Sequence, residues 1–200
     1  MTRAADAAVP ASFVGRAREL DTAETALRAA VRGEGAGLLV IGEAGVGKTR
    51  LVTELASVAT QHGVRVLWSA VSEPAVARSH GHWAQVLRIL AASSERHALV
   101  EELGGDAAEL ARLVPNLRSG LQLAAPAEPE GDDPRFRMYD AVASFVRRAA
   151  ARAPVVLVLE DLHAADLGTL RLLRFLLGET RHDPIALVAT ARDPDTEVLP

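Results

Sequence analysis

A glycine-rich segment in the first quarter of the chain has the residue types needed to hold phosphate. It reads Gly42-Glu43-Ala44-Gly45-Val46-Gly47-Lys48-Thr49 and is followed by Arg50. Its glycines allow a tight turn whose backbone N–H groups point inward at an anion. In such a turn Lys48 reaches the β- and γ-phosphates of a nucleotide, and the Thr49 hydroxyl ligates Mg²⁺. We therefore expect residues 42–50 to bind the phosphates of ATP or ADP.

The use of lysine supports this interpretation. The chain has 22 lysine and arginine residues, and Lys48 is its only lysine. A compact ammonium fits between phosphate oxygens, where a planar guanidinium is larger. The alternative is a glycine-rich surface loop in which the one lysine fell by chance. We expect Lys48 to act as a catalytic residue that contacts the phosphates.

A pair of acidic residues follows the most apolar stretch of the chain. Residues 155–159 are all valine or leucine, and Glu160 and Asp161 come next. Acids at the carboxyl end of a parallel strand lie where ligands bind in open α/β sheets. One of them can hold Mg²⁺ and the other can orient the attacking water. The alternative is a helix cap or a solvated turn.

One arginine is a candidate sensor of the nucleotide. Arg192 lies in Thr190-Ala191-Arg192-Asp193, just after an expected strand over residues 185–189. In P-loop ATPases with an extra strand between the two phosphate-binding strands, this strand end faces the γ-phosphate. Arg192 is expected to respond to nucleotide state there. The alternative is a surface arginine in a turn.

The elements that must position these residues alternate between strands and helices. Short apolar runs predict strands over residues 38–41, 64–69, 155–159 and 185–189. Helical spacing predicts helices over residues 19–31, 48–61, 82–92, 97–103, 107–114, 135–152 and 166–177. Asp166 is expected to cap the last of these helices. This alternation predicts an α/β fold with a parallel sheet and right-handed crossovers.

The length and composition predict one domain with an additional N-terminal segment and an insertion. Residues 1–11 are expected to be a flexible N-terminus, and residues 12–200 a P-loop ATPase domain. Residues 70–134 contain no clear strand and are predicted to form a helical insertion between the second and third strands. It ends in an acidic, proline-rich linker over residues 126–134.

Composition argues against several other classes of protein. The net charge of −4 gives no basic surface for nucleic acid, so no direct DNA contact is expected. Without cysteine there is no disulfide framework, and no apolar run approaches the roughly 18 residues of a membrane helix. We therefore expect a cytoplasmic protein that does not contact a membrane.

Some residues with possible chemistry are given simpler roles. His80 and His82 have the spacing of metal ligands but no third ligand in sight. Trp68, Trp83 and Tyr139 are expected to be core anchors. The helix that carries Arg147, Arg148 and Arg152 is expected to present a solvated face, not a nucleic-acid surface.

Four motifs together resemble one family of ATPases. Phe13-Val14-Gly15-Arg16 resembles the adenine-side motif of AAA-related signalling ATPases. The segment from Leu159 to Asp166 is similar to their extended Walker B segment, and residues 190–193 to their strand-end Thr-x-Arg-Asp. With the phosphate loop, this set resembles the ATPase domain of STAND-type regulators. The nearest group is the large bacterial transcription activators with a C-terminal LuxR-type DNA-binding domain.

The resemblance covers residues 12–193 and carries several implications. It places Val14, Gly15 and Arg16 near adenine and ribose. It places Glu160 at the Mg²⁺ position, where related ATPases more often have aspartate, so the roles of Glu160 and Asp161 stay open. The implied fold is a three-layer, AAA-like P-loop NTPase (ASCE type) with sheet order 1-4-3-2. A fifth strand and C-terminal domains follow in such regulators, so we expect a fragment of a longer protein.

The function that these expectations favour is an ATP-dependent signalling switch. It binds Mg-ATP, hydrolyses it slowly and reports nucleotide state to the rest of a multidomain transcriptional regulator. Its partners would be an adenine nucleotide, the C-terminal domains of the parent chain and, depending on nucleotide, a second copy of itself. Two alternatives are a motor-like AAA ATPase acting on nucleic acid and a nucleotide-binding scaffold without hydrolysis.

Overall fold

The computed structural model describes residues 16–70, 80–117 and 133–193. The expected N-terminus over residues 1–11, and Val14 and Gly15 of the adenine-side motif, lie outside the described residues. The proline-rich linker also lies outside them, except for its last two residues. Of these, Asp133 caps the helix that begins at Pro134, because its side chain accepts a hydrogen bond from the Arg135 backbone N–H.

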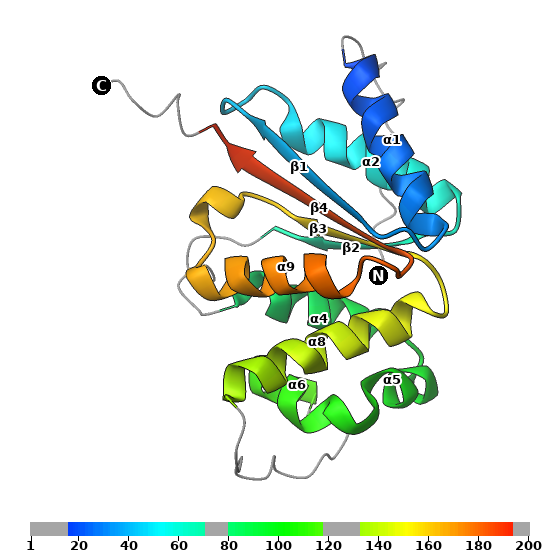
Figure 1. Cartoon of the computed structure of the whole chain (residues 1–200), viewed down its shortest axis with the longest axis vertical. Coiled ribbons are helices and arrows are strands. Elements are labelled where there is room, and N and C mark those ends of the chain that lie inside the picture. Colours follow the sequence, from blue (N-terminus) through cyan, green and yellow to red (C-terminus); the bar gives the residue numbers. More distant parts are fainter. Residues whose placement is uncertain (1–15, 71–79, 118–132, 194–200) are drawn as a thin grey trace, which may run out of the picture.

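In the described parts of the chain, four parallel strands form the sheet, in the order β1-β4-β3-β2 (Figure 1). They are β1 (Ala36–Gly42), β2 (Arg65–Ser69), β3 (Val155–Leu159) and β4 (Ile185–Arg192). Strands β3 and β4 are central and almost wholly buried, which explains why their sequences are continuous apolar runs. The predicted α/β fold and strand order are confirmed.

Helices cover both faces of the sheet (Figure 1). Helices α1 (Ala17–Val31) and α2 (Lys48–Gln61) pack on one face with Val156 and Val158 of β3. Helices α4 (Gly81–Ser93), α8 (Pro134–Ala150) and α9 (Leu167–Glu179) pack on the other with Leu157 and Leu159. Because side chains alternate along a strand, each strand residue is assigned to one face. We call them the α2 face and the α9 face.

The predicted helical insertion follows β2. After α4 it continues with α5 (Arg96–Leu103), a 3₁₀ turn (Gly104–Asp106) and α6 (Ala107–Leu113). Helices α5 and α6 pack against α8 on its side away from the sheet (Figure 1). The insertion therefore adds a further layer outside the expected three. None of the helices in the described ranges is long and apolar enough to span a bilayer.

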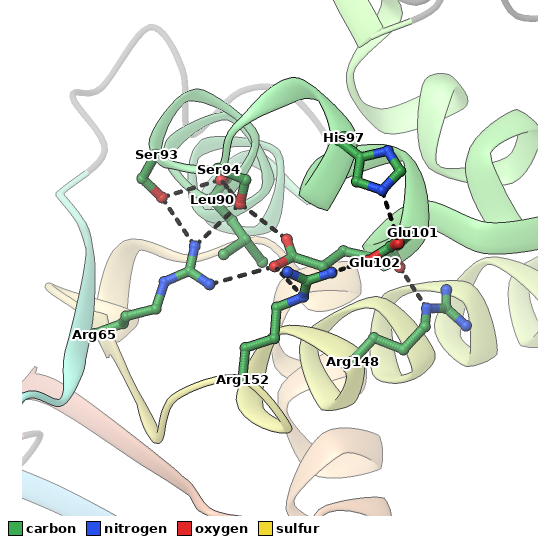
Figure 2. Close-up of polar contacts among 9 residues, drawn as sticks. All are labelled: Arg65, Leu90, Ser93, Ser94, His97, Glu101, Glu102, Arg148 and Arg152. Atoms are coloured by element: carbon green, nitrogen blue, oxygen red, sulfur yellow. Dashed lines mark hydrogen bonds and ion pairs between the residues drawn. The ribbon is translucent and has the colours of Figure 1, made fainter.

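A network of charged side chains ties the insertion to the sheet (Figure 2). Its centre is Glu102 of α5, which is only 2% exposed. Glu102 pairs with Arg65 at the start of β2 and with Arg152 just after α8, both at 3.5 Å, and accepts a 2.9 Å hydrogen bond from the Ser94 hydroxyl. These contacts join β2, α4, α5 and the end of α8.

The arginines of α8 do not form the simple solvated face that was expected. Arg147 pairs with Glu179 at 3.1 Å and with Asp183 at 3.2 Å. Arg148 donates to the Leu103 carbonyl and pairs with Asp106 at 2.6 Å. Since an arginine carries five N–H donors in a planar fork, one side chain can join two segments in this way. These arginines therefore fasten α8 to its neighbours.

Candidate functional site

The glycine-rich turn joins the end of β1 to the start of α2. Gly45 and Gly47 have φ angles of 76° and 92°, which a residue with a Cβ rarely adopts. Gly47 is the N-cap of α2, and no side chain caps the helix. The first N–H groups of α2 therefore open onto the turn together with the positive end of the helix dipole, which suits an anion.

Lys48 is held inside this turn. It is the first residue of α2 and is only 8% exposed. Its Nζ donates to the carbonyl oxygens of Gly42 and Glu43, at 2.9 Å each. An ammonium has three donors, so two of them fix Lys48 to the loop backbone and one is left over for another acceptor. Glu43, Ala44, Gly45, Val46, Thr49 and Arg50 are exposed around it.

Arg16 reaches the same turn from the start of α1. Its guanidinium donates to the Val46 carbonyl at 2.6 Å. Arg16 is the N-cap residue of α1, so this bond joins that helix end to the glycine-rich turn of residues 42–49, which we call the phosphate turn. The contact with adenine and ribose that the resemblance implies stays a prediction.

Glu160 leaves β3 toward the α2 face of the sheet. Val156 and Val158 lie on that face, and strand alternation places Glu160 there as well. Glu160 as a whole residue is 9% exposed. Its Oε2 accepts a 3.1 Å hydrogen bond from the indole N–H of Trp68, and its backbone N–H donates to the Ser69 carbonyl. This carboxylate is therefore held in place from β2.

Asp161 has a different environment. Its backbone is left-handed, with φ of 56°, and its side chain is 65% exposed. Its backbone N–H donates to the Thr190 hydroxyl at 3.0 Å. A positive φ in an aspartate is uncommon, and here the bond to Thr190 holds it. The two acids of the pair therefore leave the strand with different exposure and partners.

Arg192 is part of the sheet. The expected strand end at residue 189 was wrong, because β4 continues to Arg192, which pairs in register with Gly42 at the end of β1. The Asp193 backbone N–H then donates to the Gly42 carbonyl at 3.3 Å. Since neighbouring parallel strands end at one edge, Arg192 lies beside the start of the phosphate turn.

Trp68 is the residue at this edge that sequence reasoning missed. Trp83 and Tyr139 are buried core residues, as predicted, whereas Trp68 is half-buried and bonds to Glu160. The alternation of side chains along β2 could have indicated that Trp68 lies near Glu160. Trp68 is the next-to-last residue of β2, on the α2 face, and β2 neighbours β3.

The His80 and His82 pair has structural contacts. Burial lowers the pKa of His82, whose Nδ1 lies 3.0 Å from the buried Ser69 hydroxyl. Burial also lowers the pKa of His80, whose backbone N–H donates to Asp166. Within the described ranges no group of three or more His, Cys, Asp or Glu residues is arranged to hold a metal. A metal ion at the phosphate turn would therefore be coordinated by oxygens of the bound nucleotide as well as by protein oxygens.

The oxygen donors at this edge suit Mg²⁺. The Thr49 hydroxyl lies at the start of α2, and the carboxylates of Glu160 and Asp161 follow β3. Mg²⁺ prefers oxygen ligands and is usually held by one or two carboxylates together with phosphate oxygens and water. The residues present therefore fit a Mg-nucleotide.

Comparisons with known proteins agree with this geometry. The structure is similar to the crystal structure of Cdc6p from Pyrobaculum aerophilum, with a TM-score of 0.54 and 16% identity. The match covers 96% of this chain and 42% of that one, and it shows the shared fold. No curated protein matches the sequence. A protein family described as the AAA ATPase domain matches residues 12–188, and the chain therefore belongs to that family.

Proposed function

We propose that this domain binds Mg-ATP and hydrolyses it slowly, as the nucleotide-controlled switch of a larger regulator. The observation that carries the proposal is the buried Lys48 in a glycine turn at the uncapped N-terminus of α2. Lys48 and the first N–H groups of α2 would hold the β- and γ-phosphates. Arg16 and the preceding Val14 and Gly15 would lie on the adenine side, and Arg192 near the γ-phosphate.

Glu160 and Asp161 would have different roles in binding Mg²⁺ and in orienting the attacking water. Glu160 is nearly buried on the face that carries α2, so we assign it the Mg²⁺ side of the site, with Thr49 as the other protein oxygen. Asp161 is exposed beyond the strand end, so we assign it the orientation of the attacking water. Bound Mg²⁺ would neutralise charge on the phosphates during the reaction.

Phosphate release and nucleotide binding test this assignment. Replacing the Mg²⁺ ligand, Glu160→Gln, should weaken metal-dependent binding of ATP. Replacing the water-orienting acid, Asp161→Asn, should leave binding intact and lower kcat. The assignment fails if both variants bind and hydrolyse ATP as the wild type does.

The regulatory part of the proposal is supported by the motif set at Arg16, Glu160–Asp166 and Thr190–Asp193. A motor-like ATPase acting on nucleic acid would behave differently, because its turnover rises when it engages DNA. Equal phosphate release with and without duplex DNA favours the switch. Stimulation by DNA favours the motor.

A further inference from the structure

The described hydrogen bonds give the Glu160 carboxylate one side-chain partner, the indole N–H of Trp68. The donor–acceptor distance is 3.1 Å, and the two residues are separated by 92 positions in the sequence. An indole N–H only donates, and the Oε2 atom of Glu160 accepts it. Hydrogen bonds to charged groups are stronger than those between neutral ones.

The position of Trp68 determines the side from which this hydrogen bond reaches the Glu160 carboxylate. Trp68 and Val158 are partners in the register of β2 with β3, and Glu160 comes two residues after Val158, on the same face of the sheet. The ring packs against the core on the α2 face, which also contains Leu51, Val52 and Leu55 of α2. A ring fixed by packing holds its N–H at one point, so the carboxylate is restrained on the side of the sheet that bears the phosphate turn.

The strand that carries Trp68 is itself fastened to the helical insertion. Ser69, the next residue, contacts the ring of His82 in α4 on the opposite face. At the other end of β2, Arg65 pairs with Glu102 of α5. Edge strand β2 is therefore anchored at both ends to the insertion, while Trp68 contacts the acid of the neighbouring strand.

We propose that Trp68 is a positioning residue for Glu160: its indole N–H holds the carboxylate in the orientation that receives Mg²⁺. The proposal rests on the function proposed above. It extends the site from the phosphate turn and β3 to edge strand β2. Trp68 acts only through Glu160 and does not itself contact the nucleotide phosphates.

The contact itself is tested first, without nucleotide. The chain has two tryptophans, and the other, Trp83, is fully buried and donates to the Thr169 carbonyl. The emission of Trp68 is the difference between the wild type and Trp68→Phe. Glu160→Ala should change this emission, because it removes the charged acceptor. An identical spectrum in Glu160→Ala would overturn the contact and the proposal with it.

The second test measures ATP binding as a function of Mg²⁺ concentration. Trp68→Phe keeps an aromatic ring in the strand and removes the donor. It should raise the Mg²⁺ concentration at half-maximal binding about tenfold, as expected for one hydrogen bond to a charged group, and leave metal-free binding unchanged. An equal loss with and without Mg²⁺ would show a merely structural role and overturn the proposal.

A double-mutant cycle decides whether Trp68 acts through Glu160. In the Glu160→Ala background, Trp68→Phe should cause no further change in Mg²⁺ dependence, because the carboxylate that it positions is gone. Independent, multiplying effects would overturn the proposal. If the wild type binds no nucleotide while Glu160→Ala still changes Trp68 emission, the contact stands and the proposed function fails.

Discussion

Replacing Glu102 by glutamine should destabilise the fold measurably. Glutamine keeps the volume of the side chain and an oxygen that can accept from Ser94, but it removes the charge that faces Arg65 and Arg152. Those two guanidiniums would then lose a common counter-ion at the junction of β2, α5 and α8 (Figure 2). The change therefore isolates the electrostatic part of the network.

The magnitude follows from burial. Each pair at 3.5 Å has a Coulomb attraction of about 5 kcal/mol at an effective dielectric constant of roughly 20, much of which offsets desolvation. Losing one partner of a fully buried pair costs about 3–5 kcal/mol. Arg65 and Arg152 are 23% and 43% exposed, so water partly replaces the lost carboxylate. We therefore expect a loss of about 2–3 kcal/mol, below the fully buried case.

Thermal unfolding followed by circular dichroism measures this loss. For a domain of this size, a loss of that magnitude lowers Tm by about 4–12 °C. The matched control is Glu101→Gln on the adjacent residue, which also pairs with Arg152 but is 54% exposed. It should cost about 1 kcal/mol or less, as surface pairs do. If the two variants unfold at the same temperature, burial does not make the ion pairs of Glu102 more stabilising than those of the exposed Glu101.

Three further outcomes are expected. Burial raises the pKa of Asp166, but hydrogen bonds from Thr169 and from the His80 backbone outweigh it and hold the pKa below its usual range. The stability that the ionised Asp166 contributes relative to Asp166→Asn should therefore be full at neutral pH and be lost in acid as the pH falls through the lowered pKa, which acid unfolding of the two proteins measures. Thr190→Val removes the acceptor of the Asp161 N–H and should lower kcat more than ATP affinity, measured by steady-state kinetics. Leu39 is 54% exposed on β1, which pairs only with β4 among the described strands, so Leu39→Lys should reduce self-association in sedimentation velocity.

The sheet was predictable because its central strands are buried on both faces. Residues 155–159 contain only valine and leucine, a pattern that a buried parallel strand requires. The cap at Asp166 was also predictable from local chemistry, because its side chain accepts the Thr169 N–H three residues later. Local rules and burial thus determine the elements that position the phosphate turn.

Contacts between distant segments could not be read in the same way. Strand β4 extends to Arg192 because β1 supplies hydrogen-bond partners there, and only the register of the two strands reveals this. The bond from Trp68 to Glu160 joins β2 to β3 across the whole helical insertion. A long-range bond of this kind depends on tertiary packing, which hydrophobic periodicity does not encode.

Calorimetric titration with Mg-ATP shows directly whether residues 42–50 bind phosphate. Lys48→Ala removes a charge-assisted contact to phosphate and should weaken binding by about tenfold to a hundredfold, or 1.5–3 kcal/mol. Arg32→Ala is the control, since it also removes one positive charge. Arg32 forms an exposed pair with Glu34 just before the first residue of β1, whereas the phosphate turn follows the last residue of that strand. Binding that is weakened in Lys48→Ala and normal in Arg32→Ala is the predicted result. Superimposable titration curves for the wild type and Lys48→Ala would contradict the assignment of residues 42–50 as a phosphate site.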